Sequence, residues 1–317
     1  MSDETNVRKL GPEGMIRTDG NRVWLGELFG LPCGSFGRDG RISRTEGLAV
    51  ISSSIGRFEG PGLSLAECEE TAEGVRLTCR AAGSALELTS AWSRGEGGVL
   101  SRRDRLTNRS DGPVTLFRCL ARLVFSPGRY EVYAQDSRWT AESQGGWLPL
   151  AVGGGELGHA WGRTTEGGTP YLVLREAGGR RGVALHLLPK GNWTIRVTTP
   201  GRSNELPYAV VELGQADEDL RLVLAPGESF DAPEILIQAV PHGEPHLAAP
   251  ALHRYVNARL RTADLRPPKI VYNTWFDRFG QLEPARLRTQ LAAAQEIGCE
   301  VFVVDAGWYG RGEGDWF

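Results

Sequence analysis

The sequence predicts a mainly β protein in which a large antiparallel β-sandwich precedes a single βαβ unit. Short strand-like segments recur from about residue 10 to residue 240, and turn-forming residues separate them without intervening helices, which predicts the sandwich. Strand, helix and strand patterns then follow one another over residues 270–304, which predicts two parallel strands with a crossover helix.

The segments of the sandwich alternate apolar with polar residues, as is typical of sheets that bury one face and expose the other. Between them lie Gly, Pro, Asn and Asp residues that supply the special backbone angles of turns. The expected strands include residues 75–79, 86–92, 208–213, 220–224 and 234–240, and the expected turns include residues 39–40, 111–113 and 225–227.

A helical pattern over residues 247–260 ends before Pro267 and Pro268, and two consecutive prolines favour an extended segment. We therefore expect three parts: a sandwich over residues 1–245, a helical linker over residues 246–268, and the βαβ unit within residues 269–317.

In the βαβ unit, residues 270–275 and 300–304 have the β-branched and aromatic composition of buried strands. The helix between them begins with Pro284 just inside its first turn and has Gly298 just past its end. Parallel strands end at the same edge, so Trp275 and Asp305 are expected on one rim, with Trp308 after the glycine that follows Asp305. Barrel enzymes carry their sites at this edge.

Each of these residues also has a structural interpretation. Asp305 could cap a following helix, and Trp275 and Trp308 could be rim packing. Only nine residues follow Trp308, so a parallel barrel would have barely begun and the chain is expected to be a fragment.

Composition excludes several functions. The formal net charge is −3 and 24% of the residues are charged, so no basic surface for nucleic acid is expected. No run of about 18 apolar residues and no apolar leader occurs, which predicts a cytoplasmic protein without a membrane partner. Five widely spaced cysteines suggest reduced thiols.

No cofactor or metal site is expected. Residues 153–158 have the spacing of a dinucleotide fingerprint, but no βαβ pattern surrounds them, and a flexible loop is expected there. His242, His246 and His253 lack the spacing of a zinc motif, since Pro245 separates the first two.

Several segments carry a family resemblance. Residues 273–275 (NTW), 303–309 (VVDAGWY) and 314–317 (GDWF) resemble, in this order, the start of the catalytic barrel in glycoside hydrolase family 36, the α-galactosidases. Residues 133–139 and 189–193 are more loosely similar to that family's N-terminal β-supersandwich. The resemblance implies an antiparallel β-supersandwich followed by the first βαβ unit of a (β/α)8 barrel.

The resemblance also implies a function. Family members are retaining glycosidases that remove terminal α-galactose from oligosaccharides, using two carboxylates. Both of those lie on later barrel strands, so no catalytic residue is expected before Phe317. Asp305, Trp308 and Trp275 match residues that hold the sugar. Neither metal nor cofactor is implied, and the full-length protein would be a homo-oligomer.

One position departs from the family pattern. Where two adjacent aspartates often stand, this chain has Asp305 followed by Ala306, which puts the preference for galactose in doubt. Two other functions stay open: a non-catalytic carbohydrate-binding or assembly domain, and an α-galactosyl transferase relative.

Overall fold

The computed structural model describes residues 6–34, 47–150, 153–160, 162, 164–200, 207–259 and 267–312. The chain forms two compact units, unit 1 (Met1–Arg259) and unit 2 (Leu260–Phe317). The turn expected at residues 39–40 and the motif at residues 314–317 lie outside the described residues.

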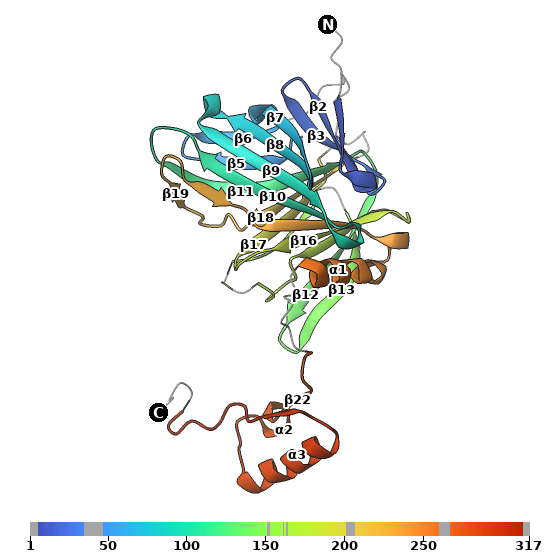
Figure 1. The fold of residues 1–317 in the computed structure, drawn as a ribbon, viewed down its shortest axis with the longest axis vertical. Helices are drawn as coiled ribbons and strands as arrows, with labels where there is room; N and C mark the ends of the chain where they lie inside the picture. Colours follow the sequence, from blue (N-terminus) through green and yellow to red (C-terminus); the bar gives the residue numbers. More distant parts are fainter. Residues whose placement is uncertain are drawn as a thin grey trace. The chain divides into compact units, whose positions relative to one another are not determined.

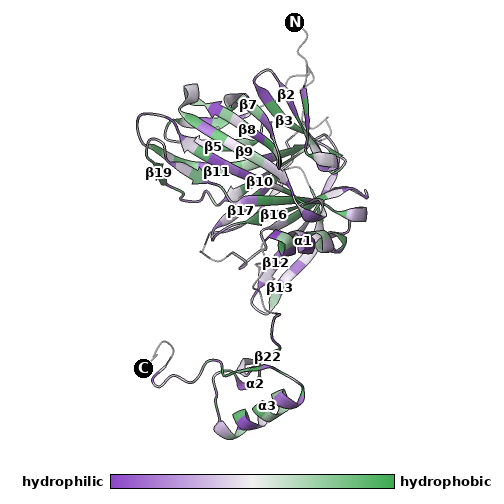
Figure 2. Ribbon diagram, viewed as in Figure 1, coloured by the Kyte–Doolittle hydropathy of each residue, from purple (hydrophilic) through white to green (hydrophobic). Residues whose placement is uncertain are grey.

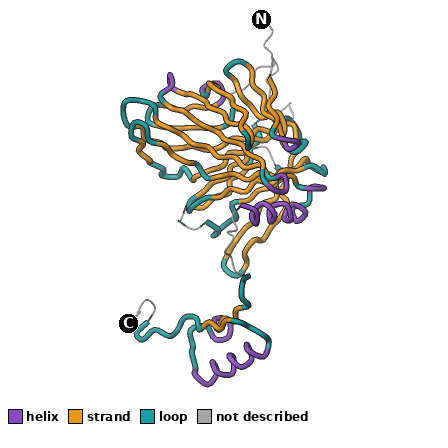
Figure 3. Tube along the Cα trace, viewed as in Figure 1, coloured by secondary structure: helices purple, strands orange, loops and turns teal. Residues whose placement is uncertain are grey.

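Unit 1 is built of antiparallel strands (Figures 1 and 3). Within its described residues, the largest sheet has ten strands, in the order β13 (Ala141–Pro149), β12 (Tyr130–Arg138), β15 (Tyr171–Glu176), β16 (Gly182–Leu188), β21 (Glu234–Ala239), β10 (Leu100–Asn108), β9 (Leu86–Arg94), β8 (Gly74–Ala81) and β7 (Ser64–Thr71), with β20 (Ser229–Asp231) paired to β10.

Two further sheets complete the described part of unit 1. The seven-stranded sheet has the order β14 (Gly155–His159), β17 (Trp193–Thr198), β18 (Ala209–Gln215), β11 (Val114–Phe125), β5 (Ala49–Ser53) and β6 (Gly56–Glu59), with β19 (Leu222–Leu224) paired to β11. The four-stranded sheet is β1 (Asn6–Lys9), β2 (Gly14–Asp19), β3 (Arg22–Leu28) and β4 (Leu31–Pro32). Short 3-10 turns are η1 (Gly11–Glu13), η2 (Gly60–Gly62), η3 (Ala82–Ser84), η4 (Glu96–Gly98) and η5 (Pro241–Gly243).

The mainly β, antiparallel fold class is thus confirmed. Each of the five strands expected from alternation coincides with an observed strand to within two residues at its ends. Hydrophilic and hydrophobic residues alternate along β8 and β9 (Figure 2). The apolar faces of all three sheets meet in one core, in which Trp92, Phe125, Trp193 and Ile16 are fully buried. Burying each such side chain contributes about 1.5–3 kcal/mol.

The prediction of a flexible loop at residues 153–158 is wrong for most of this segment, because residues 155–158 belong to strand β14, which pairs in register with β17. The glycines there permit close approach. A Cβ on Gly154, whose φ is +93°, would lie 1.9 Å from the carbonyl oxygen of Val197, and one on Gly158 would lie 2.9 Å from that of Trp193. The same Gly-rich spacing therefore serves strand packing here rather than flexibility.

Helix α1 (Pro245–Arg259) packs against the β-strands of unit 1. The side chain of Gln238 on β21 donates to the carbonyl of Ala248 at 2.7 Å. The ring of buried Tyr255 occupies the space where a side chain on Gly95 would stand. The helix expected as part of a linker over residues 246–268 thus lies within unit 1, and we propose the domain boundary after Arg259; residues 260–266 lie outside the described residues.

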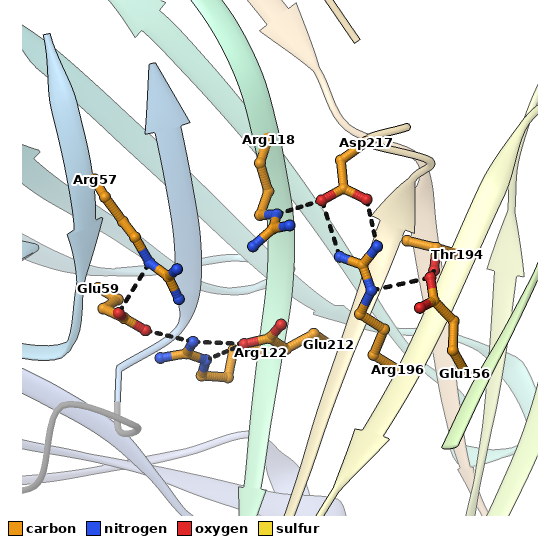
Figure 4. Close-up of polar contacts among 9 residues, drawn as sticks. All are labelled: Arg57, Glu59, Arg118, Arg122, Glu156, Thr194, Arg196, Glu212 and Asp217. Carbon is orange, nitrogen blue, oxygen red and sulfur yellow. Dashed lines mark hydrogen bonds and ion pairs between the residues drawn. The ribbon is translucent and has the colours of Figure 1, made fainter. Parts of the chain in front are cut away.

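The seven-stranded sheet carries a row of ion pairs (Figure 4). Arg122, Glu212 and Arg196 alternate along their strands with residues of the apolar core, so this row lies on the face opposite to the core. Arg122 bridges Glu59 at 2.6 Å and Glu212 at 2.8 Å. Farther along the face, Arg196 bonds Asp217 and Glu156, each at 2.9 Å. Partial burial acts to raise the pKa of Asp217, but hydrogen bonds from Arg196 and Arg118 leave it lower than usual.

Unit 2 contains the expected βαβ arrangement. Strand β22 (Val271–Asn273) pairs in parallel with β23 (Val301–Val303), and α3 (Pro284–Glu296) lies between them in sequence. The first strand is shorter than expected, because Thr274 has helical backbone angles and the short helix α2 (Trp275–Arg278) begins there. Among the helices of the described residues, none is both long and apolar enough to cross a bilayer.

Candidate functional site

The candidate site lies at the carboxyl edge of the two parallel strands in unit 2. Asn273 is the last residue of β22 and is in register with Val303, the last residue of β23. Asp305 follows Val303 by two residues. The pairing therefore brings the segments that carry Trp275 and Asp305 to the same edge, as expected from the sequence.

The carboxylate of Asp305 is held on both oxygens. Oδ2 accepts a hydrogen bond from Nδ2 of Asn273 at 2.7 Å, and Oδ1 accepts one from the backbone N–H of Ala306 at 2.8 Å. The backbone N–H of Asp305 donates to Oγ1 of Thr274 at 3.1 Å. A carboxylate has about four lone-pair positions, so Asp305 can still accept hydrogen bonds from a ligand.

The helix-cap interpretation of Asp305 receives no support from the described residues, because none of residues 304–312 is helical. Its side chain instead bonds one neighbouring amide and one side chain on the adjacent strand end.

The two tryptophans differ in their surroundings. Trp275 is the first residue of α2 and is half-buried, and its ring packs edge-on against Phe279 with centroids 5.2 Å apart. Trp308 is 52% exposed and its ring lies beside that of Tyr309, 5.8 Å away. Trp308 thus presents an indole surface that a ligand could contact, while Trp275 is partly engaged in packing.

A glycine fixes the path of the chain between Asp305 and Trp308. Gly307 has φ +104°, and a Cβ there would lie 2.0 Å from the carbonyl oxygen of Gly280. Only glycine allows this close approach of the loop after β23 to the loop after α2.

The other carboxylates near the ends of these elements are engaged elsewhere. Asp277 pairs with Arg286, and hydrogen bonds from that guanidinium hold the pKa of Asp277 below its usual value. Glu283 pairs with Arg278 at 3.3 Å. Glu300 precedes β23 and accepts the N–H of Ile270 at 3.0 Å, at the strand edge opposite to Asp305. The described part of unit 2 thus offers Asp305 without a second carboxylate beside it.

Asn273 and Thr274 were not among the expected site residues, although both contact Asp305. The signal was present in the sequence, since a polar Asn-Thr pair ends an otherwise apolar strand. The register of the parallel pair was needed to place them.

A cavity of about 730 Å³ is lined by residues of unit 1 alone, including Arg76, Arg103, Arg105 and Arg109. Acidic side chains pair with these arginines, as Asp231 does with Arg105 at 2.6 Å, so the cavity lies on the polar outer face of the ten-stranded sheet. Among the described residues, no group of three or more His, Cys, Asp or Glu side chains is placed to hold a metal ion.

Sequence comparison relates the chain to α-galactosidases. No protein-family model matches it. It is 24% identical over 277 residues to α-galactosidase AgaA of Geobacillus stearothermophilus, covering 82% of this chain and 37% of that protein. It is 26% identical over 308 residues to an α-galactosidase of Escherichia coli, covering 88% of this chain and 42% of that protein. The chain thus spans about two fifths of the length of these relatives.

Solved structures share the fold. The family 36 α-galactosidase AgaA of Geobacillus stearothermophilus superposes with a TM-score of 0.77 at 16% identity, over 99% of this chain and 52% of the solved chain. The galactosidase domain of the α-galactosidase-sucrose kinase AgaSK gives 0.76 at 15% identity, over 98% and 51%. Variants of AgaA have been solved with raffinose and with stachyose. The resemblance to family 36 predicted from the sequence is confirmed.

Proposed function

We propose that this chain is the N-terminal part of a family 36 glycoside hydrolase, and that the whole protein is a retaining α-galactosidase acting on terminal α-galactosides of oligosaccharides. The observation that carries the proposal is Asp305, a carboxylate fixed at the shared edge of two parallel strands with an exposed indole three residues later. Relatives that align with most of this chain are α-galactosidases.

In this proposal the site residues bind sugar and do not perform the chemistry. Asp305 accepts hydrogen bonds from two galactose hydroxyls with the lone pairs that Asn273 and Ala306 leave available. Trp308 packs its indole face on the apolar C–H face of the pyranose, and Trp275 forms part of the wall. The nucleophile and the general acid/base come from barrel strands that follow in the whole protein.

The surface of unit 2 supports a larger barrel. Apolar side chains on or beside its two strands are exposed: Ile270 by 60%, Val271 by 53% and Val304 by 41%. Two parallel strands alone bury too little to be stable, and further strands and helices of a (β/α)8 barrel would cover these residues.

The test is hydrolysis by the full-length protein. It should release p-nitrophenol from the α-galactoside and not from the β-galactoside, and the first sugar detected by NMR should be the α-anomer, as retention requires. Raffinose should yield galactose and sucrose. Transfer of galactose to a second sugar without hydrolysis would favour the transferase relative, and sugar binding without turnover would favour the non-catalytic domain.

A further inference from the structure

We infer that Asn273 is a positioning residue of this site: it holds the carboxylate of Asp305 in the orientation that receives the sugar. The inference rests on the proposed function and adds to it a residue that does not itself need to touch the substrate. It comes from two hydrogen bonds made by the two ends of one side-chain amide.

The orientation of this amide is determined by its neighbours. Oδ1 of Asn273 accepts the backbone N–H of Trp275 at 2.8 Å, and that partner can only donate. Nδ2 must therefore face Asp305, where it donates to Oδ2 at 2.7 Å. A hydrogen bond to an ionised carboxylate is stronger than one between neutral groups, and this one also joins the ends of the two strands.

A second contact from the neighbouring residue fixes the backbone. Thr274 is 3% exposed, donates its N–H to the carbonyl of Val303 at 3.1 Å, and accepts the N–H of Asp305 on its hydroxyl at 3.1 Å. Asn273 therefore restrains the side chain of Asp305 while Thr274 restrains its backbone.

This restraint has a consequence for binding. With Oδ2 bound to Asn273 and Oδ1 bound to the N–H of Ala306, rotation of the carboxylate would break two hydrogen bonds. Its remaining lone pairs are thus aimed before the sugar arrives, and little ordering is left to oppose binding. Removing the amide donor would free the carboxylate to rotate.

Asn273→Asp provides a test with a pH-dependent signature. The variant has nearly the same shape, but at neutral pH it places two carboxylates against each other. Repulsion between the two negative charges then destabilises the pair and turns the carboxylate of Asp305 away. At acidic pH one proton shared between the two groups restores a hydrogen bond to Asp305. Asn273→Ala removes the donor and offers no such restoration.

The measurement is kcat/KM of the full-length protein on p-nitrophenyl α-galactoside from about pH 7 to about pH 5. At pH 7 both variants should lose at least about tenfold, which corresponds to about 1.4 kcal/mol. Relative to wild type, Asn273→Asp should recover as the pH falls, whereas Asn273→Ala should not. Tyr272→Phe is the matched control, since this neighbour lies on the other face of β22 and stacks on Phe302, and it should match wild type.

The outcomes separate the two ideas. A wild type without activity on any aryl glycoside would overturn the proposed function and the inference with it. An active wild type in which Asn273→Asp loses activity equally at every pH, or loses none, would overturn the positioning role alone. Should Asn273→Asp fail to fold, Asn273→Ala decides alone: without the amide donor it should raise KM more than it lowers kcat, and an unchanged KM would overturn the positioning role.

Discussion

The side chains of Arg102 and Asp104 form a bidentate ion pair inside the sandwich, with Nη2 to Oδ2 at 2.7 Å and Nε to Oδ1 at 3.0 Å. Both residues are on β10, and they are 0% and 5% exposed. Arg102 also donates to the carbonyl of Arg122 on β11, and Asp104 accepts the hydroxyl of Ser90. The pair therefore connects the ten-stranded sheet to the seven-stranded sheet across the core.

Arg102→Met should be strongly destabilising, because it leaves the carboxylate of Asp104 buried without its cation. We expect a loss of about 3–5 kcal/mol in the free energy of unfolding, measured by urea denaturation. Arg105→Met is the matched control: Arg105 lies on β10 like Arg102, but its ion pair with Asp231 of β20 is exposed, so the loss should be less than about 1 kcal/mol. Similar losses in the two variants would contradict the assignment of Arg102 to the core.

His186 should make the protein sensitive to mild acid. Burial lowers the pKa of His186 to about 4. The unfolded chain takes up this proton near pH 6.5, so the unfolded state binds more protons between about pH 6.5 and pH 4 and stability falls as the pH drops through this window. Across the whole window, the free energy of unfolding should fall by about 3 kcal/mol because of this one histidine.

The measurement is the free energy of unfolding at several pH values. His186→Gln should flatten its decline between about pH 6.5 and pH 4, whereas His253→Gln, at an exposed position of α1, should leave the decline unchanged. The carboxylates with lowered pKa values, such as Asp217, lose their stabilising effect as the pH falls below about 5, and they do so equally in both variants, so the difference between the two variants reports on His186. An unchanged slope in His186→Gln would show that the imidazole is not buried in its neutral form.

The strands could be predicted where burial imposes a period of two, and the polar features could not. Leu86 to Trp92 alternates so regularly that β9 follows from the sequence. Arg102 and Asp104 occupy inward positions of β10, where the same pattern demands apolar residues, and only the paired structure explains them. The glycines of residues 153–158 fit both a loop and a close-packed strand, and a distant partner, β17, decides between the two.

The edge on which the candidate site lies could also be predicted, because a parallel βαβ unit places Trp275 and Asp305 together. The exact start of α2 could not, since it depends on Asn273 bonding the N–H of Trp275. The sugar-binding roles of Asp305, Trp308 and Trp275 remain predictions, because the described residues supply only two strands of the proposed rim.

Asp305→Asn in the full-length protein should reduce kcat/KM on p-nitrophenyl α-galactoside by at least about tenfold, or about 1.4 kcal/mol of transition-state binding. The fold should persist, because the new side chain has the same shape. Asp277→Asn removes a carboxylate from α2 whose partner is Arg286, and it should have little effect on kcat/KM. Near-wild-type kinetics of Asp305→Asn would argue against sugar binding by this carboxylate.

Ala306 should loosen sugar recognition. Its methyl group offers no acceptor beside Asp305, where the family pattern expected from the sequence has a second aspartate, and a missing charge-assisted hydrogen bond is worth about 1.5–3 kcal/mol. We expect modest discrimination between p-nitrophenyl α-galactoside and the β-arabinoside, which lacks the hydroxymethyl arm, when their kcat/KM values are compared. A preference above about a thousandfold would mean that another residue supplies the contact.

In a preparation of residues 1–317 alone, unit 1 should be folded and no glycosidase activity should be detected. Unit 1 has a continuous apolar core across its three sheets and should give one cooperative unfolding transition. Unit 2 exposes Ile297 by 71% and Phe276 by 84%, so limited proteolysis should remove residues from unit 2 before it cuts unit 1. The two strands of unit 2 cannot enclose a sugar, so no hydrolysis is expected. The assay is release of p-nitrophenol from the α-galactoside, with a preparation from cells that lack their own α-galactosidase as the control. Turnover by this polypeptide would show that a catalytic pair lies within these residues, and the proposed division of labour, with sugar binding here and chemistry on later strands, would then be wrong.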